Sequence, residues 1–133
     1  NSDLERMGDQ AVNIAERTLE LLKEPLLKPL IDLPRMAELV QRMVKESLDA
    51  FVQQDAARAR AVCRQDDEVD RYDDQLFREL LTYMMENPQA ITRSVHLILV
   101  SRHLERIADH ATNVAEDVIY LVEGKTIKHH VAE

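Results

Sequence analysis

The chain has 133 residues, 45% of them apolar, and a formal net charge of −8. This length and this apolar content suit a single packed core. The negative charge repels phosphate backbones and anionic lipid headgroups, which argues against nucleic acid as a direct partner. We therefore expect a globular protein whose direct partners are neither nucleic acids nor anionic lipids.

The single cysteine, Cys63, cannot form an internal disulfide, and no secretory signal pattern opens the chain. The longest apolar runs, such as "LILV" at 97–100, are far shorter than the roughly 20 residues that span a bilayer. We therefore expect a soluble, cytoplasmic protein that does not insert directly into the membrane.

Only two Gly and four Pro interrupt a sequence rich in helix-forming residues, which predicts long helices with short connections. The first helix should end before Pro25, because Pro25, Pro29 and Pro34 prevent a regular helix in "EPLLKPLIDLP". Pro34 suits the first turn of a second helix that runs to about residue 53. Asp55 then suits the N-cap of the third helix.

The third helix should end near Glu86, where Asn87 and Pro88 form an N-cap followed by a proline at the first helical position. Gly124 suits the position just after the end of the fourth helix. These signals predict an all-α fold with an antiparallel three-helix bundle. The predicted segments are a helix at 1–24, a linker at 25–33, the bundle at 34–124 and a C-terminal tail at 125–133.

The stretch "HLERIADHATNVAED", residues 103–117, has a near copy, "DLERMGDQAVNIAER", at residues 3–17. The two copies share Leu, Glu, Arg, Asp, Ala, Asn, Ala and Glu at matching offsets. In the later copy, apolar residues alternate in steps of four and three, which is the spacing of a core-facing seam. The seam residues are Leu104, Ala108, Ala111, Ala115, Val118 and Val122.

A row of oxygen-bearing side chains runs beside this seam. Charged residues ordinarily cover the wet face of an amphipathic helix, so a solvated row is the first interpretation. The row consists of Glu105, Asp109, Asn113 and Glu116, and the earlier copy repeats it with Glu5, Asp9, Asn13 and Glu16.

The third helix favours a second interpretation, because "RQDDEVDRYDDQL" places six acids within nine residues. Asp66, Asp70 and Asp74 follow one another in steps of four, and like charges at that spacing destabilise a helix. Asp70 lies about as far before the turn between the third and fourth helices as Glu105 lies after it. In an antiparallel pair, the acidic rows of the two helices should therefore meet.

Facing carboxylates raise one another's pKa values unless a cation neutralises them, so the rows predict a metal site on the bundle surface. A set of oxygen ligands suits hard ions such as Mg²⁺, Ca²⁺, Mn²⁺ or ferric iron. The sequence contains no Glu-x-x-His motif of the kind that binds metal inside ferritin-like bundles. The candidate ligands are Asp66, Asp70, Glu105, Asp109, Asn113 and Glu116.

His96, His103 and His110 recur every seven residues on one face of the fourth helix. Neighbouring members of this row lie about 10 Å apart along the helix axis, so they cannot all bind one ion. We interpret the row as a solvated face, from which one histidine could join a carboxylate cluster at its edge.

At these residues the chain resembles the PhoU proteins, which regulate phosphate uptake in bacteria. "LERIADHATNVAEDVIYLVEG" resembles the end of a PhoU repeat, and "LERMGDQAVNIAE" resembles the same element of the preceding repeat. Members have two three-helix bundles whose E(D)xxxD motifs bind metal clusters. The resemblance covers nearly the whole chain and implies that 1–24 is the last helix of an incomplete first repeat. The motif matches are Glu5 with Asp9, Asp66 with Asp70, and Glu105 with Asp109.

The resemblance implies a non-enzymatic adaptor that links the phosphate ABC transporter to the phosphate-sensing histidine kinase and represses the phosphate-starvation response. Iron, Mn or Mg ions would occupy the carboxylate clusters. Two alternatives stay open: a carboxylate-bridged metal-dependent enzyme, and a helical oligomerisation scaffold that needs no metal. The apolar stripe of 1–24 has no partner in the predicted bundle, so a homodimer or a swapped assembly is also expected.

Overall fold

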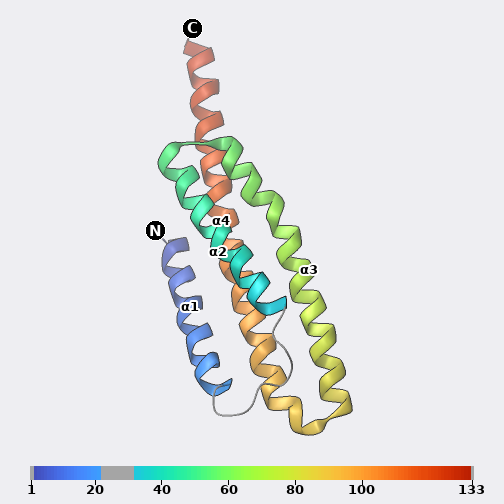
Figure 1. Ribbon diagram of the computed structural model, residues 1–133. Coiled ribbons are helices and arrows are strands. Elements are labelled where there is room, and N and C mark those ends of the chain that lie inside the picture. Colours follow the sequence, from blue (N-terminus) through green and yellow to red (C-terminus); the bar gives the residue numbers. More distant parts are fainter. Residues whose placement is uncertain (1, 22–31, 133) are drawn as a thin grey trace.

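The computed structural model describes residues 2–21 and 32–132, and this part of the chain consists of helices joined by short turns (Figure 1). The all-α prediction is therefore confirmed. The elements in chain order are α1 (Ser2–Leu21), α2 (Asp32–Gln53), α3 (Ala56–Glu86), the short 3-10 helix η1 (Pro88–Ala90) and α4 (Ile91–Ala132).

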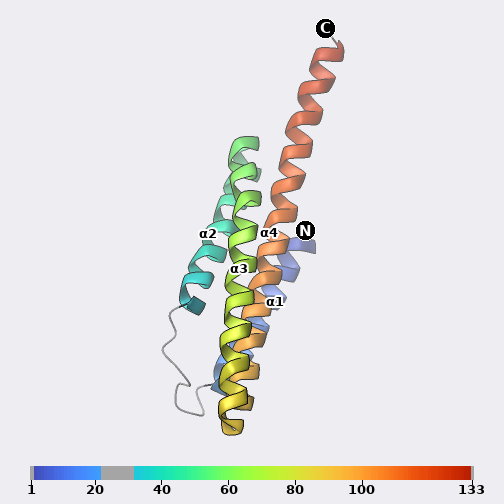
Figure 2. The same ribbon diagram turned by 90° about the vertical axis from the view of Figure 1, so that its right-hand side faces the viewer.

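Helices α3 and α4 form a long antiparallel hairpin, and α2 packs against both to complete a three-helix bundle (Figure 1). Helix α1 packs along α4, on the opposite side of α4 from α3, as both views show (Figure 2). The C-terminal end of α4 projects beyond the bundle (Figure 2). The central position of α4 brings the two copies of the duplicated stretch into contact.

The predicted caps are confirmed on both sides of α3. The Asp55 side chain accepts a hydrogen bond from the Arg58 backbone N–H at 3.0 Å, which satisfies one of the free donors of the first turn. The Asn87 side chain accepts from the Gln89 N–H at 3.1 Å, and Pro88 begins η1. The chain therefore turns where these local signals place the turn.

Two predicted helix ends were wrong. Helix α2 begins at Asp32, two residues before Pro34, because a proline in the first turn gives up an N–H that has no intrahelical acceptor there. Helix α4 passes through Gly124 and ends at Ala132, so the segment predicted as a C-terminal tail continues the helix. No described glycine has a positive φ, so Gly124 does not end the helix in a left-handed conformation. The predicted end of the first helix and most of the linker lie outside the described residues.

The predicted seam of α4 lies in the core of the bundle. In α4, Ala108, Ala111 and Ala115 are fully buried, and these small side chains let the neighbouring helices approach closely. Larger side chains fill the remaining space: Met36, Leu39, Val40 and Met43 of α2, and Val62, Val69 and Leu76 of α3. This packing fixes the rotation of α3 and α4 about their axes, and with it the direction of their acidic rows. None of the described helices is long and apolar enough to cross a membrane.

Candidate metal-binding face

We call the carboxylate-rich side of the α3–α4 hairpin the acidic face; it consists of Asp66, Asp70 and Asp73 on α3 and Glu105 and Asp109 on α4. The buried seams of the two antiparallel helices face each other, so residues rotated to the same side of both seams share one surface. Burial is the largest cause of the raised pKa of both Asp66 and Glu105, and charges on the facing helix, Asp109 for Asp66 and Asp73 and Asp70 for Glu105, add to it. The structure therefore brings the two predicted acidic rows together.

The centre of the acidic face is a hydrogen-bonded pair of carboxyl groups, Asp73 and Glu105. Asp73 is only 5% exposed; the Ser101 hydroxyl donates to its Oδ1 at 2.7 Å, and the Arg102 Nε lies 3.3 Å from its Oδ2. Burial, followed by the charge of Asp73 and the hydrogen bond to it, raises the pKa of Glu105 from 4.5 to about 7. Burial beside Asp73 therefore disfavours the charged form of Glu105.

The carboxyl groups on either side of this pair are also crowded. Burial, with the charges of Asp70 and Asp109 next in size, raises the pKa of Asp66. Burial and the charge of Asp70 raise the pKa of Asp109, against a smaller opposing effect of His110. One oxygen of Asp66, Oδ1, is buried and has no hydrogen-bond partner among the described residues. Each of these observations describes negative charge without a compensating cation.

Asp73 was missed in the sequence, where Asp74 was chosen as the third member of the row. The structure leaves Asp74 exposed and buries Asp73. The seam of α3 advances in alternating steps of four and three, so a row that follows the seam runs from Asp66 to Asp70 and then to Asp73. The same alternation that identified the seam would have identified the third acid.

The remaining candidates lie at the margins of the acidic face or outside it. Glu116 is exposed, and its charge contributes to the raised pKa of Asp66. Asn113 is exposed and points toward α1, where its amide donates to Asp3 Oδ1 at 3.5 Å. Glu5 and Asp9 are exposed on α1, and the described residues give neither of them a hydrogen bond or an ion pair.

The donor chemistry of the acidic face fits a hard cation, because every candidate ligand offers oxygen and Asp66 holds a buried oxygen without a partner. As the side chains stand, no three His, Cys, Asp or Glu residues in the described part of the chain converge closely enough to hold one ion. Binding would require the exposed carboxylates, such as Asp70 and Asp109, to turn toward a common point. Such rotamer changes are readily available to exposed side chains.

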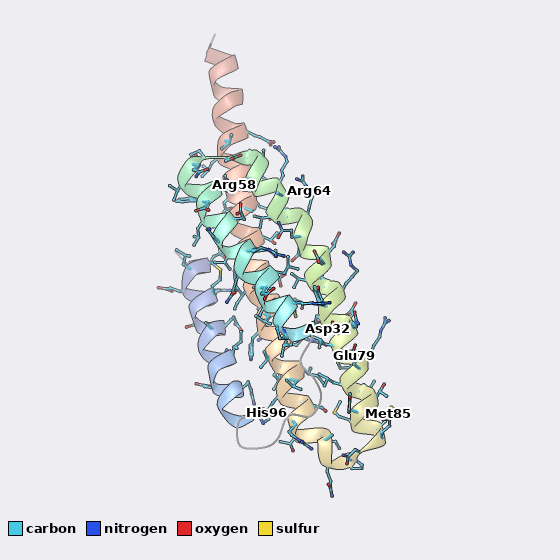
Figure 3. The ribbon with its side chains drawn as sticks, in the orientation of Figure 1. Asp32, Arg58, Arg64, Glu79, Met85 and His96 are labelled. Atoms are coloured by element: carbon cyan, nitrogen blue, oxygen red, sulfur yellow. The ribbon has the colours of Figure 1, made fainter. Side chains whose placement is uncertain are left out.

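The sequence suggested that the histidine row forms a solvated face, and this interpretation was wrong. The row faces α1. His103 is 8% exposed, and burial, together with the charges of Arg106 and Arg17, lowers its pKa. His96 lies beside the C-terminal end of α1 (Figure 3). The polar contacts repeat every seven residues on both helices: Asp3 with His110 at 2.9 Å, Gln10 with His103 at 2.6 Å, and Arg17 with His96 at 3.4 Å.

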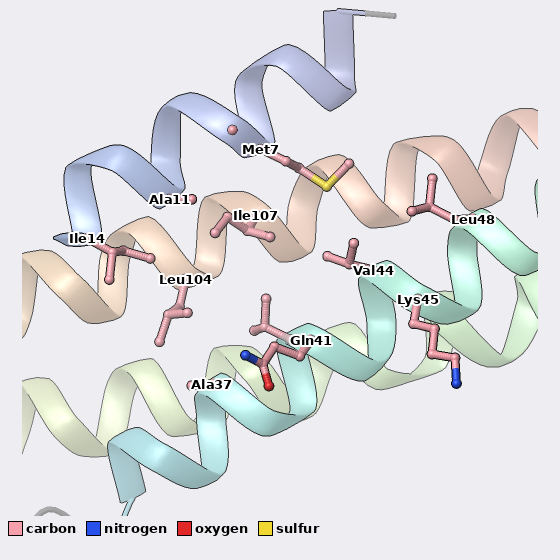
Figure 4. A pocket seen from close by; sticks show the side chains of 12 residues that line it. Met7, Ala11, Ile14, Ala37, Gln41, Val44, Lys45, Leu48, Leu104 and Ile107 are labelled. Carbon is pink, nitrogen blue, oxygen red and sulfur yellow. The ribbon is translucent and has the colours of Figure 1, made fainter.

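An apolar groove of about 700 Å³ lies between α1, α2 and α4 (Figure 4). Met7 is buried against the bundle, whereas Leu4 is 44% exposed and Gly8 and Ala11 are exposed. The apolar stripe of α1 is thus only partly covered by the described residues. The side chains around the groove are Met7, Ala11, Ile14, Ala37, Val40, Gln41, Val44, Lys45, Leu48, Leu104 and Ile107, with Gly8 beside them.

Comparison with known proteins finds relatives that are named for phosphate transport. The phosphate-specific transport system accessory protein PhoU homolog of Aquifex aeolicus is 54% identical over 133 residues, covering 99% of this chain and 60% of the relative. The corresponding homolog of Pseudomonas aeruginosa is 46% identical, covering 96% of this chain and 53% of the relative. The chain thus spans little more than half the length of such relatives.

Solved structures show the same fold. The crystal structure of PhoU from Pseudomonas aeruginosa superimposes with a TM-score of 0.88 at 46% identity, over 92% of this chain and 59% of that chain. The phosphate transport system regulatory protein PhoU from Streptococcus pneumoniae superimposes with a TM-score of 0.83 at 32% identity, over 92% of this chain and 58% of that chain. A family model described as the PhoU domain matches residues 33–118. The chain belongs to the PhoU family.

Proposed function

We propose that this chain belongs to a cytoplasmic adaptor that links the phosphate ABC transporter to the phosphate-sensing histidine kinase and represses the phosphate-starvation response. Membership of the PhoU family supports this assignment, since the relatives are described as accessory or regulatory proteins of phosphate transport. The single observation that carries a mechanism is the acidic face, where carboxylates from two helices crowd and Arg102 forms an ion pair with Asp73 alone among the described contacts. Helix faces of this kind suit docking to other proteins.

In this proposal, Asp66, Asp70, Glu105 and Asp109 hold iron, Mn or Mg ions, and Asn113 and Glu116 extend the ligand set. A bound cation would neutralise the acidic face and offer a contact point for phosphate or for an acidic group of a partner. Ligation requires deprotonated carboxylates, so metal binding should release the proton of Glu105, whose pKa is raised. Glu5 and Asp9 would form the matching site of the preceding repeat, of which α1 is the last helix.

The partly exposed apolar stripe of α1 supports a homodimer or a swapped assembly in this proposal. In this proposal residues 34–124 form the second repeat and 25–33 the linker, and 125–132 extend α4. Two rival functions have less support. A metal-dependent enzyme would be expected to carry the Glu-x-x-His motif, which the sequence lacks. A metal-free helical scaffold leaves the crowding of Asp66 and Glu105 unexplained.

The experiment that tests the metal site compares the parent chain with a variant in which Asp70→Asn is combined with Glu105→Gln. A metal at about 100 times its dissociation constant stabilises a protein by about 2.7 kcal/mol, so added Mn²⁺, Mg²⁺ or ferric iron should raise the melting temperature of the parent. The variant should lose this response and its bound metal. In chelator it should melt above the parent, because the mutual repulsion of the carboxylates is relieved.

A matched control combines Glu38→Gln with Asp117→Asn, which removes the same charge from exposed positions outside the acidic face. This control should keep the metal response of the parent. The metal proposal is abandoned if parent and variant respond identically to all three ions, and the helical scaffold then remains as the function.

A further inference from the structure

The surface that carries the acidic face becomes apolar toward the turn between α3 and α4. Five large apolar side chains are exposed there, and Met85 is 78% exposed. Single exposed apolar residues are common on protein surfaces, whereas a contiguous group marks a contact site. We call this group the apolar tip; its members are Phe77, Leu81 and Met85 on α3 and Ile91 and Val95 on α4.

Two contacts show that the apolar tip continues the acidic face. The Arg102 guanidinium stacks over the Phe77 ring at 5.5 Å, and its Nε lies 3.3 Å from Asp73. Residues four apart stay on nearly the same side of a helix, so Leu81 follows Phe77 and Asp73 along α3. Arg102 thus joins an acidic half and an apolar half of one surface.

The dimensions of this surface match a single helix. From Asp66 to Met85 it extends for about 28 Å at 1.5 Å per residue, which is the length of a helix of about 19 residues. Met85 lies at the turn end of the hairpin and Arg64 near the opposite end of α3 (Figure 3). A partner helix laid along the hairpin would therefore contact both halves at once.

The charges of the surface select the chemistry of that helix. The acidic half presents the exposed carboxylates of Asp70 and Asp109, which favour a cationic neighbour, whereas the five members of the apolar tip carry no charge. A second copy of the chain fits poorly: pairing the surfaces in parallel sets acid against acid, and antiparallel pairing buries carboxylates against apolar side chains. An anionic membrane is repelled by the same carboxylates and by the net charge of −8.

We propose that the α3–α4 face binds a helical segment of a partner protein that is apolar in one half and rich in Lys or Arg in the other. The apolar half packs on Phe77, Leu81 and Met85, and the basic half pairs with the acidic face. This interaction requires no metal, so it goes beyond the metal-dependent contact of the proposed function. Metal ions and the basic half use the same carboxylates and therefore compete.

The test uses a fluorescent helical peptide of about 20 residues, long enough to span the surface, with leucines on one face of its first half and lysines on the same face of its second half. A peptide of identical composition with leucine and lysine interleaved is the control ligand. Binding to the whole chain is followed by fluorescence anisotropy in EDTA, so that failure of metal binding cannot affect the result. The segregated peptide should bind roughly tenfold or more tightly than the interleaved one.

Variants of the chain locate the site. Leu81→Ser with Val95→Ser should weaken binding of the segregated peptide roughly tenfold or more, and Asp70→Asn with Asp109→Asn should do the same. The matched control is Val52→Ser with Tyr120→Ser, which changes residues exposed by 79% and 81% outside the tip and should leave binding intact.

Three results would overturn the proposal: equal binding of the two peptides, unchanged binding by the tip variant, or a change in the self-association of the chain when the tip is altered. The last result would assign the tip to contact between copies of the chain. Once metal binding has been shown independently, added Mn²⁺ should displace the segregated peptide. Undiminished peptide binding at saturating metal would contradict the shared use of the carboxylates.

Discussion

Replacing Glu105 with glutamine tests the crowding of the acidic face directly. Burial and the neighbouring Asp73 raise the pKa of Glu105 from 4.5 to about 7, so the folded protein disfavours its charged form. Below pH 4.5 the group is protonated in both the folded and the unfolded state and does not change the free energy of unfolding. Between pH 4.5 and about 7, the unfolded state has released its proton while the folded state still holds it. The parent therefore loses stability as the pH rises from 4.5 to about 7.

The size of this loss follows from the two pKa values. At about 1.36 kcal/mol per pKa unit, a shift of this size without solvent screening would lower the free energy of unfolding by about 3.4 kcal/mol. Glu105 is partly solvated, so screening reduces the cost to about 1–2 kcal/mol. Glutamine cannot ionise, and its amide N–H can still donate to Asp73. Glu105→Gln should therefore raise the free energy of unfolding by about 1–2 kcal/mol near pH 8 and by almost nothing near pH 4.

The assay is urea denaturation of both proteins at the two pH values, in EDTA to remove metal. Glu38→Gln, at an exposed position of α2 away from the acidic face, is the matched control and should change stability by less than about 0.5 kcal/mol at either pH. The reasoning is refuted if Glu105→Gln gives no gain near pH 8, or if the gain is the same at both pH values.

Four further substitutions test the packing and the helix ends. Leu80→Ala should lower the free energy of unfolding by about 2–5 kcal/mol, because Leu80 is 1% exposed, whereas the adjacent Leu81→Ala, at 41% exposure, should cost less than about 1 kcal/mol in urea denaturation. Asp55→Ala should cost about 1 kcal/mol in the same assay through loss of the α3 cap, and an unchanged midpoint would contradict the cap. Gly124→Ala should stabilise α4 locally by about 0.5–1 kcal/mol, because a Cβ there meets no atom within 4 Å. Amide hydrogen exchange measures this local stability, and faster exchange around residue 124 in the variant would show that the glycine ends the helix after all.

The features that were predictable from the sequence depend on neighbours within a few residues. Asp55 and Asn87 cap helices through contacts that span only two or three residues, so their roles are readable without the fold. The seam of α4 and the row beside it are properties of one helix, and the rotation of the acidic row follows from them. The prediction that the fourth helix ends at Gly124 was wrong, because a glycine marks a helix end only when the following chain leaves the helix. The glycine itself does not determine that.

The features that were missed depend on contacts between distant segments. The buried state of His103 follows from the docking of α1 on α4, which no pattern within α4 announces. A signal was nevertheless available, since Asp3, Gln10 and Arg17 repeat every seven residues in the earlier copy, as the histidines do in the later one. Asp73 was missed because steps of four were followed where the seam alternates four and three. The binding of metal by the acidic face stays a prediction.

The contact between α1 and α4 has the form of an isologous dimer interface inside one chain. Residues 3 and 103 occupy equivalent positions in the two copies, as do 10 and 110, so the pair Asp3–His110 becomes the pair His103–Gln10 when the copies are exchanged. Each copy thus presents the same surface to the other, as the subunits of a two-fold dimer do. An ancestor with one repeat could have paired with itself through this helix, and duplication would then have joined the two halves without requiring a new interface. The two copies differ at the contact itself, where acid, amide and imidazole side chains occupy equivalent positions.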